Sequence, residues 1–253
     1  MKIASWNVNS IKARAPHVKT WLEKNRPDIL MIQELKGEAF PEEDFAALGY
    51  HIAANGQKAY NGVATLSLHP IEIISTTLDG DAEDAQARYL ETKINNIRMI
   101  NIYLPNGNPV GSEKYPYKLG WMARLERRMA ELRAQRDTFL VAGDFNVIPA
   151  DEDCYDPKAW AEDALFRPET RQAYRRLINL GLTDAFRVLN RGDRHYTFWD
   201  YQAGSWPANK GLRIDHILLS PPLADRLQDC FIDTEPRGWE KASDHTPILA
   251  ILG

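Results

Sequence analysis

The segment FLVAGDFN, residues 139–146, contains the most hydrophobic of the short strand-like runs in the chain, and polar residues follow it directly. An apolar run of this length that ends at a glycine is typical of a buried strand, and the glycine permits the close approach of another backbone. Asp144 and Asn146 would then lie just past the strand, where a rigid sheet can hold side chains in a fixed geometry.

Further strand-like runs occur along the whole chain, with only a few helices between them. The expected strands are Lys2–Trp6, Ile29–Gln33, Gly62–Ser67, Tyr89–Ile94, Ile97–Tyr103, Phe139–Gly143, Ile214–Ser220 and Pro247–Leu252. A doubly wound parallel sheet would need a crossover helix after nearly every strand. The pattern therefore predicts an α+β fold, in which largely antiparallel or mixed sheets pack face to face and helices cover the outer sides.

Three helices are expected. Apolar residues recur at spacings of three and four over Leu119–Arg133, which places one apolar stripe against a sheet. A second helix is expected over Pro16–Asn25 and a third over Glu169–Leu180, which Gly181 would end. No low-complexity linker interrupts these elements, and 253 residues suit one large domain better than two. We therefore expect a single domain over residues 1–253.

The composition is that of a soluble globular protein, with 44% hydrophobic and 26% charged residues. No apolar run approaches the roughly 18 residues that a membrane-spanning helix requires, and the first residues suggest a strand and no secretion signal. Two cysteines, Cys154 and Cys230, are too few for a disulfide framework or a zinc cluster. These features predict a cytoplasmic protein with no membrane partner.

The net charge of −4 argues against a protein that binds nucleic acid mainly by neutralising phosphates, because such proteins usually carry a basic excess. Local basic patches, or a bound divalent cation that supplies positive charge at one phosphate, would remove the difficulty. The alternative is that no nucleic acid is involved, and composition alone favours that alternative.

Polar residues also cluster at the ends of other expected strands, in the segments WNVN (6–9), IQE (32–34), NIYLP (101–105), SDH (243–245) and, at a strand start, RIDH (213–216). Each has a plain explanation when it is taken alone. Asn7 and Asn9 would suit a turn, and Glu34 a solvated strand end. Tyr103 could be a packing residue with a tethered hydroxyl, and His245 part of an ordinary surface pair.

Taken together, these strand ends favour a metal-dependent hydrolase. They present carboxylate, carboxamide and imidazole groups, and none presents a nucleophilic serine or cysteine in a suitable setting. Carboxylate and amide oxygens are the ligands that Mg²⁺ and Mn²⁺ prefer, and Glu34 is the first candidate ligand. The remaining histidines lack a comparable setting, and we expect a structural role for His17, His51, His69, His195 and His216.

On these residues the sequence resembles the exonuclease III group of abasic-site endonucleases, within the endonuclease/exonuclease/phosphatase superfamily. The resemblance spans nearly the whole chain and includes WNVNSIKAR, IQELK, NIYLPNG, GDFNV, PADEDCYDPKAW, YTFWDY, GLRIDHILLS and SDHTP. The stretches 151–160 and 196–220 look like the bacterial DNA-repair branch of the superfamily, whereas GDFN is common to many members. The resemblance implies a four-layer α/β sandwich of the DNase I type.

The resemblance also implies the residues of a metal site and their roles. Mg²⁺ is the expected cofactor, with Mn²⁺ as the alternative, and Glu34 is the main ligand within a shell that would include Asn7, Asp144, Asn146, Asp244 and His245. The catalytic residues would be Tyr103, Asp144, Asn146, Asp215 and His245.

In this scheme Asp144, held by Asn146, orients or activates the attacking water, and the Asn146 amide can donate to the charge that develops on the phosphorus oxygens. His245 contacts the scissile phosphate, and Asp215 accepts from its other ring nitrogen. Tyr103 directs its hydroxyl at the phosphate or at the leaving 3′ oxygen. The cation neutralises a phosphate oxygen as water attacks.

The substrate implied by the resemblance is double-stranded DNA with abasic sites or 3′ ends, bound by a monomer without an obligate protein partner. Phe198, Leu212 and Ile214 match positions that in the family form a small apolar pocket for a flipped-out abasic sugar, with core packing as the alternative. Further substrate contacts are expected at Asn9, Lys36, Asn106, Trp206 and Arg213.

Other cationic and aromatic residues near the predicted catalytic loops could contact phosphates on both strands, although some would be ordinary solvated loop residues. They are Arg14, Lys114, Lys118, Lys210, Arg237, Lys241 and Trp239. Two other functions stay open: a phosphatase or lipid phosphodiesterase with the same metal site, and a DNA-binding protein that has lost the chemistry. The relative strengths of abasic-site incision, 3′ exonuclease, 3′-phosphatase and RNase H-like activity also stay open.

Overall fold

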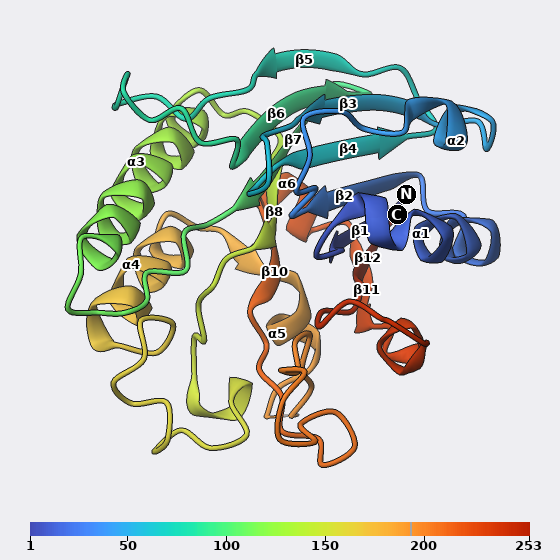
Figure 1. The fold of residues 1–253 in the computed structure, drawn as a ribbon. Helices are drawn as coiled ribbons and strands as arrows, with labels where there is room; N and C mark the ends of the chain where they lie inside the picture. Colours follow the sequence, from blue (N-terminus) through green and yellow to red (C-terminus); the bar gives the residue numbers. More distant parts are fainter. Residues whose placement is uncertain (193) are drawn as a thin grey trace.

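The computed structural model describes residues 1–192 and 194–253, and it contains two six-stranded sheets that pack against each other (Figure 1). The first sheet has the order β11 (Leu227–Ile232), β12 (Ile248–Leu252), β1 (Lys2–Asn7), β2 (Ile29–Gln33), β4 (Val63–Ser67) and β3 (His51–Asn55). The second has the order β5 (Glu72–Ser75), β6 (Tyr89–Ile94), β7 (Ile97–Tyr103), β8 (Phe139–Asp144), β10 (Asp215–Leu219) and β9 (Thr183–Asp184).

Each sheet has one parallel pair of strands within otherwise antiparallel pairing. β1 pairs in parallel with β2, and β7 pairs in parallel with β8. A parallel pair requires a crossover connection, and the chain places a long helix in each of these two connections. The helices are α1 (Ile11–Asn25) and α3 (Lys114–Ala134). The predicted α+β fold with mixed sheets is confirmed.

Apolar side chains fill the space between the two sheets. Ile3 and Met31 of the first sheet belong to the same buried cluster as Leu140 and Ile217 of the second. Strands β2, β8 and β10 are buried at every residue, which explains their continuous apolar runs.

Helices cover the two outer faces and complete four layers. On the first sheet, Trp21 and Leu22 of α1 pack against Trp6 and Leu30, and α2 (Glu42–Ala46) contributes Phe45. On the second sheet, α3 and α4 (Pro168–Asn179) pack over the apolar residues of β7 and β8. The short elements α5 (Ala185–Leu189), α6 (Pro221–Ala224) and the 3₁₀ turns Asp151–Asp153 and Glu235–Gly238 lie in the connections.

The sequence-based prediction missed four strands, and all four are sheet edges: β3, β5, β9 and β11. An edge strand buries few side chains, and β5 has the pattern of an exposed strand, with Ile73 53% exposed. Its sequence therefore lacks the apolar run that marks a central strand. The helix expected from Pro16 begins five residues earlier, at Ile11, and accommodates Pro16 inside it.

None of the helices in the described part of the chain combines the length and apolar character needed to cross a bilayer.

The strand register brings the polar strand ends to one edge of the sandwich. Tyr103 at the end of β7 lies beside Asp144 at the end of β8, and Asp215 at the start of the antiparallel β10 lies on the other side of Asp144. In the facing sheet, Asn7 at the end of β1 lies beside Gln33 at the end of β2.

Candidate active site

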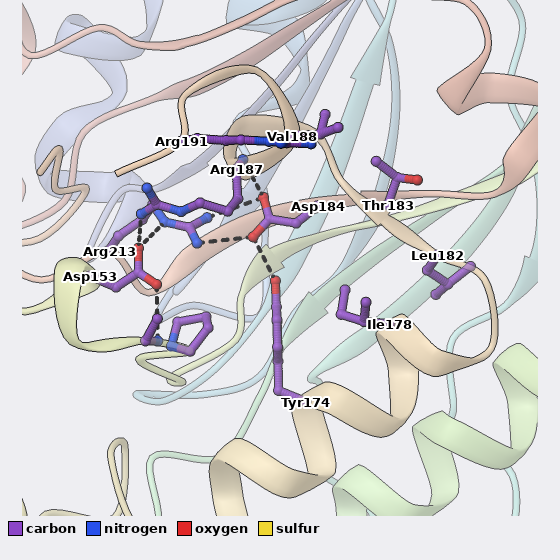
Figure 2. A pocket seen from close by; sticks show the side chains of 12 residues that line it. Asp153, Tyr174, Ile178, Leu182, Thr183, Asp184, Arg187, Val188, Arg191 and Arg213 are labelled. Atoms are coloured by element: carbon purple, nitrogen blue, oxygen red, sulfur yellow. Dashed lines mark hydrogen bonds and ion pairs between the residues drawn. The ribbon is translucent and has the colours of Figure 1, made fainter. Parts of the chain in front are cut away.

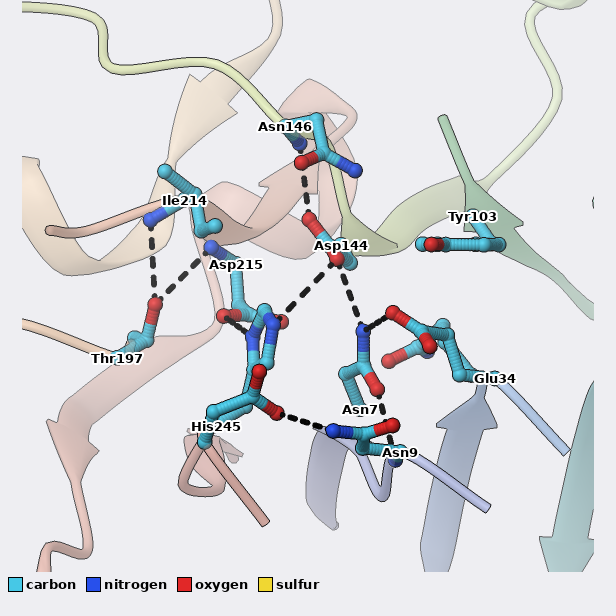
Figure 3. Close-up of polar contacts among 12 residues, drawn as sticks. Asn7, Asn9, Glu34, Tyr103, Asp144, Asn146, Thr197, Ile214, Asp215 and His245 are labelled. Carbon is cyan, nitrogen blue, oxygen red and sulfur yellow. Dashed lines mark hydrogen bonds and ion pairs between the residues drawn. The ribbon is translucent and has the colours of Figure 1, made fainter. Parts of the chain in front are cut away.

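Three side chains from separate segments converge at this edge of the sandwich. One ligand atom each of Glu34, Asp144 and His245 lies within 4.8 Å of the other two. Figure 3 shows these side chains pointing toward one another from both sheets, with Asn7 between the two carboxylates. The predicted cluster of strand ends therefore meets in space.

Asn7 connects the two carboxylates as a hydrogen-bond donor. Its fully buried side-chain amide donates to Glu34 Oε1 and to Asp144 Oδ2, both at 2.9 Å. Its own oxygen accepts from the backbone N–H of Asn9 at 2.9 Å, and the Asn9 amide donates to Asp244 at 3.0 Å. Asn7 thus orients the carboxylates through its nitrogen, while Asp244 lies one hydrogen bond further out.

Glu34 stands on a strained turn directly after β2, with a φ of 56° that places it in the left-handed region. Lys36 lies 2.8 Å from its second carboxylate oxygen and also donates to Asn9. Burial acts against ionisation, but the hydrogen bonds from Asn7 and Lys36 lower the pKa of Glu34 below its usual value. The carboxylate is therefore charged at neutral pH.

Asp144 is held by the turn that follows β8. The backbone N–H of Asn146 donates to Asp144 Oδ1 at 2.9 Å. This backbone conformation requires a glycine at position 143. Gly143 has a φ of +146°, and a Cβ there would lie 1.9 Å from the Ile102 carbonyl oxygen. Burial, with the charges of Asp215 and Glu34, raises the pKa of Asp144 to about 7 against the opposing charge of His245.

His245 donates from Nδ1 to Asp215 Oδ2 at 2.8 Å, and its Nε2 lies 3.7 Å from Asp144. Thr197 fixes the Asp215 backbone, because its hydroxyl accepts from the N–H groups of Ile214 and Asp215 at 3.1 Å. Although burial acts to lower the pKa of His245, the charges of Asp215 and Asp144 raise it to about 10. The imidazole is therefore a cation at neutral pH.

Tyr103 lies beside Glu34 and Asp144 at the end of β7 (Figure 3). Burial and the charges of these two carboxylates raise the pKa of the Tyr103 hydroxyl well above its usual value, so it stays protonated and can donate. Arg88 lies over its ring at 4.8 Å. This cation–π contact holds the ring in place.

The donor set fits a divalent cation that prefers oxygen ligands. Glu34 and Asp144 offer carboxylate oxygens on one side of the cluster, and Asp244 lies nearby. Within the described residues, Asp215 Oδ1 is buried without a hydrogen-bond partner, and repulsion from Asp215 and Glu34 adds to the effect of burial in raising the pKa of Asp144. A bound cation would remove this repulsion.

The cluster opens into a cavity of ≈ 290 Å³. Its polar wall includes Asn106 and Asn146 beside the cluster, and its apolar wall includes Phe198 and Ile214. The Phe198 ring lies 5.0 Å from His245, edge to face. Five further lining residues were not predicted: Asn108, Trp160, Asp163, Leu165 and Asp200. Trp160 ends the distinctive stretch 151–160, so the sequence could have indicated it, whereas nothing in the sequence marks Leu165.

The structure contradicts the prediction that Arg213 contacts substrate. Arg213 is fully buried, where its Nε donates to Asp153 at 2.6 Å and its guanidinium lies 2.9 Å from Asp184. Figure 2 shows this ion-pair network on the wall of another cavity, of ≈ 430 Å³. A buried guanidinium that forms ion pairs with two buried carboxylates is a structural group. His216, for which a structural role was expected, is also buried and contacts Arg213 at 2.9 Å.

Three other expected contacts lie apart from the cavity surface. Leu212 is 1% exposed and packs behind Phe198 and Ile214, so its core-packing alternative holds. Trp206 packs edge to face on Trp199 at 4.8 Å, outside the cavity lining. Lys118 is fully buried and therefore cannot contact DNA phosphates. Lys36 and Asn9 lie at the cluster itself, as described above.

Comparisons with known proteins agree with this geometry. The family model described as "Endonuclease/Exonuclease/phosphatase family" matches residues 4–245. A curated relative, exodeoxyribonuclease III of Haemophilus influenzae, is 38% identical, and the alignment covers 99% of each chain. An AP endonuclease from Archaeoglobus fulgidus has a TM-score of 0.96 and 42% identity, over 100% of this chain and 99% of that one.

A variant of the 3′ phosphatase NExo from Neisseria, solved with a product DNA hairpin, has a TM-score of 0.97 and 39% identity, again over 100% and 99% of the two chains. The family match covers most of the chain, and the relatives match it from end to end. The chain therefore belongs to the endonuclease/exonuclease/phosphatase family, and within it to the exonuclease III group.

Proposed function

We propose that this protein is a Mg²⁺-dependent DNA phosphodiesterase of base-excision repair, which incises the backbone 5′ to abasic sites and removes nucleotides from 3′ ends. The observation that carries the proposal is the convergence of Glu34, Asp144 and His245 beside a cavity with an apolar wall. Full-length relatives named as exodeoxyribonuclease III and AP endonuclease support the same reaction. We further propose that the protein acts as a cytoplasmic monomer on double-stranded DNA.

Glu34 and Asp144 would hold the cation, and Asn7 would fix the angle between their carboxylates. Mg²⁺ is the expected ion and Mn²⁺ the alternative, since both prefer oxygen ligands and use few protein carboxylates. When bound, the ion neutralises a phosphate oxygen and stabilises the charge that develops during hydrolysis. Asp244 lies within reach of this shell through Asn9.

His245 acts on the phosphate as a cation. Its Nδ1 proton is engaged by Asp215, and its raised pKa places a second proton on Nε2, which faces the cluster. A doubly protonated imidazole has no lone pair for a metal, so we assign His245 to phosphate binding and not to the metal shell. Its charge offsets the net acidity of the protein where the phosphate binds.

Asp144 is placed to accept a proton from the attacking water or to orient it. Positioning is its main contribution, because an aspartate is by itself a weak base. Asn146 holds Asp144 through its backbone N–H, and its side chain faces the same cavity. Tyr103 can donate its hydroxyl proton toward the phosphate or the leaving oxygen.

The apolar wall suits a sugar that carries no base. Extruding a nucleotide costs a few kcal/mol, and the cost is smallest where no base is stacked. Phe198 and Ile214 offer an apolar surface, and Leu165 and Trp160 line the same cavity. The cavity therefore favours abasic sites over intact nucleotides.

The test is cleavage of end-labelled duplexes with an abasic site, a nick, a blunt end or a 3′ phosphate, at increasing Mg²⁺ concentration. We expect Mg²⁺-dependent incision at the abasic site and shortening from 3′ ends. The variant Asp144→Asn should lose roughly 10²–10³-fold in kcat, as for the loss of a general base or of a preorganised electrostatic group. Hydrolysis of soluble phosphate monoesters with no cleavage of any duplex would instead indicate the phosphatase alternative.

A further inference from the structure

Lys118 carries a buried amino group that the mechanism above does not use. It lies in the second turn of α3 and is fully buried. No described carboxylate forms an ion pair with it. Its Nζ instead donates to two backbone carbonyl oxygens, those of Asn106 at 3.0 Å and Asn146 at 2.5 Å. Such a placement is costly, because the buried amino group loses its water without gaining an opposite charge in contact, and burial lowers the pKa of Lys118 to about 7.

The two carbonyls belong to the two loops that form the polar wall of the cavity. Asn106 follows β7 and Asn146 follows β8, and both side chains line the cavity. There the Asn106 amide donates to Asn146 Oδ1 at 3.0 Å, and the Asn146 amide donates to the Leu104 carbonyl at 2.9 Å. The two asparagines are therefore joined twice, through Lys118 on their backbones and through a hydrogen bond between their side chains.

The surrounding backbone is shaped to this lysine stem. Gly107 has a φ of +90°, and a Cβ at this position would lie 2.7 Å from Lys118 Cδ and 3.2 Å from Ala164 Cβ. The loop after β7 therefore packs directly on the methylene groups of Lys118. Asn146 also has a positive φ, of 48°, a conformation that persists only when its surroundings hold it.

We propose that Lys118 is a positioning residue, which sets the distance between Asn106 and Asn146 and so the geometry of the cavity wall that faces the phosphate. The inference rests on the proposed function for the role of that wall. A purely structural filler would not need an amino group that donates to both loops, because methionine has a similar length and no desolvation cost.

The main test compares Lys118→Met with a control, Lys24→Met, which removes an exposed lysine near the end of α1, away from the candidate active site. We expect Lys118→Met to lower kcat on an abasic duplex by roughly 10–100-fold, because a displacement of about 1 Å near the reacting groups can cost 10²-fold. KM should change less than about threefold, since most DNA contacts are untouched. Lys24→Met should leave kcat within about twofold of the wild type.

Two further variants separate positioning from stability. Lys118→Arg keeps a donor for both carbonyls and should have a kcat closer to the wild type than Lys118→Met, even if its melting temperature falls. Combining Lys118→Met with Asn106→Ala should give less than the product of the two single effects, since both act on the same pair. If Lys118→Met does not fold, the kcat values of Lys118→Arg and Lys118→Gln can be compared with that of the wild type in the same way.

Two results would overturn the inference. One is a folded Lys118→Met variant with kcat within threefold of the wild type. The other is a double variant whose loss of kcat equals the product of the losses in Lys118→Met and Asn106→Ala. A crystal structure of Lys118→Met gives a test that does not depend on activity: an unchanged hydrogen bond between Asn106 and Asn146 would also overturn it. A wild-type protein that cleaves no duplex would refute the proposed function instead, and that structure would still decide the role of Lys118.

Discussion

Asp215 and His216 are neighbours in β10, yet they belong to two clusters of charged residues that are built in opposite ways. Asp215 joins Asp144 and His245 in the candidate active site, where one of its oxygens has no hydrogen-bond partner among the described residues. His216 joins the closed cluster around Arg213, where Asp153 and Asp184 lie 2.6 and 2.9 Å from the guanidinium. Successive residues of a strand point to opposite faces, which separates the two clusters.

The two clusters shift the pKa of a buried aspartate in opposite directions, as Asp184 and Asp144 show. In both cases burial acts to raise the pKa. The charge of Arg213 overcomes burial and lowers the pKa of Asp184 to about 2. At Asp144 burial prevails over the charge of His245, and the nearby carboxylates of Asp215 and Glu34 add to it, so the pKa rises to about 7. A buried cluster whose charges cancel is structural, and one with excess negative charge is prepared to bind a cation.

Removing the cation of the closed cluster should have the largest effect. Arg213→Met leaves Asp153 and Asp184 buried without a counter-charge, and we expect a loss of about 3–5 kcal/mol in the free energy of unfolding. The folded pKa of Asp184 is depressed from 3.8 to about 2, so this ion pair stabilises the fold above pH 3.8 and less as the pH falls through about 2. Chemical denaturation of both proteins at neutral and acidic pH measures the difference.

Asp215→Asn is the matched control in the candidate active site, the open cluster of this comparison. Its free energy of unfolding should change by less than half as much. Equal destabilisation by the two variants at neutral pH would mean that the distinction between a closed and an open cluster is wrong.

The second-largest effect expected is a change in the pH dependence of kcat in Asp215→Asn. In the wild type the pKa of His245 is raised from 6.5 to about 10, so the imidazole keeps its charge up to about pH 10. Without Asp215 this pKa falls, and the charge is lost as the pH rises within that window. The ratio of wild-type to variant kcat should therefore widen between pH 6 and 9, to roughly 10²-fold at the basic end.

Asp200→Asn serves as a control for this profile, because Asp200 lines the same cavity but is exposed. Its kcat should follow the wild-type pH profile. Parallel profiles for Asp215→Asn and the wild type would show that His245 does not depend on Asp215 for its charge.

The smallest effect expected is stabilisation of the fold by the cation. Mg²⁺ at 10 to 100 times its Kd should raise the free energy of unfolding by about 1–3 kcal/mol, because it binds only the folded state. Thermal unfolding with and without Mg²⁺ measures this increase, and Glu34→Gln should abolish most of it. In the closed cluster, Asp153→Asn should leave the increase intact. A Mg²⁺ response that survives Glu34→Gln but is lost in Asp153→Asn would place the cation at the wrong cluster.

The central part of the fold was predictable from the sequence, and the edges were not. β2, β8 and β10 are buried on both faces, so burial itself selects the apolar runs that identify them. β5 and β11 lie at the edges with exposed side chains, and they form because a neighbouring strand offers hydrogen bonds. The sequence of an edge strand contains no local pattern that indicates these hydrogen bonds from its neighbour.

The candidate site shows the same division. Glu34, Asp144 and His245 were found because polar residues that directly follow apolar strands are conspicuous, and because the resemblance covers them. Arg213 and Lys118 were misjudged as contacts to DNA, since nothing local distinguishes a buried cation from one on a loop surface. Their partners decide the question: Asp153 lies 60 residues from Arg213, and the carbonyl of Asn146 lies 28 residues from Lys118.

The sequence by itself determined which segments are central strands, that polar groups follow them, and which family chemistry these groups resemble. Those properties depend on neighbouring residues and on the alternation of side chains along a strand. Only the tertiary structure decided which charges are cancelled by a partner and which are not. Electrostatic energy in a protein interior depends on distances between groups far apart in the chain, and only folding sets those distances.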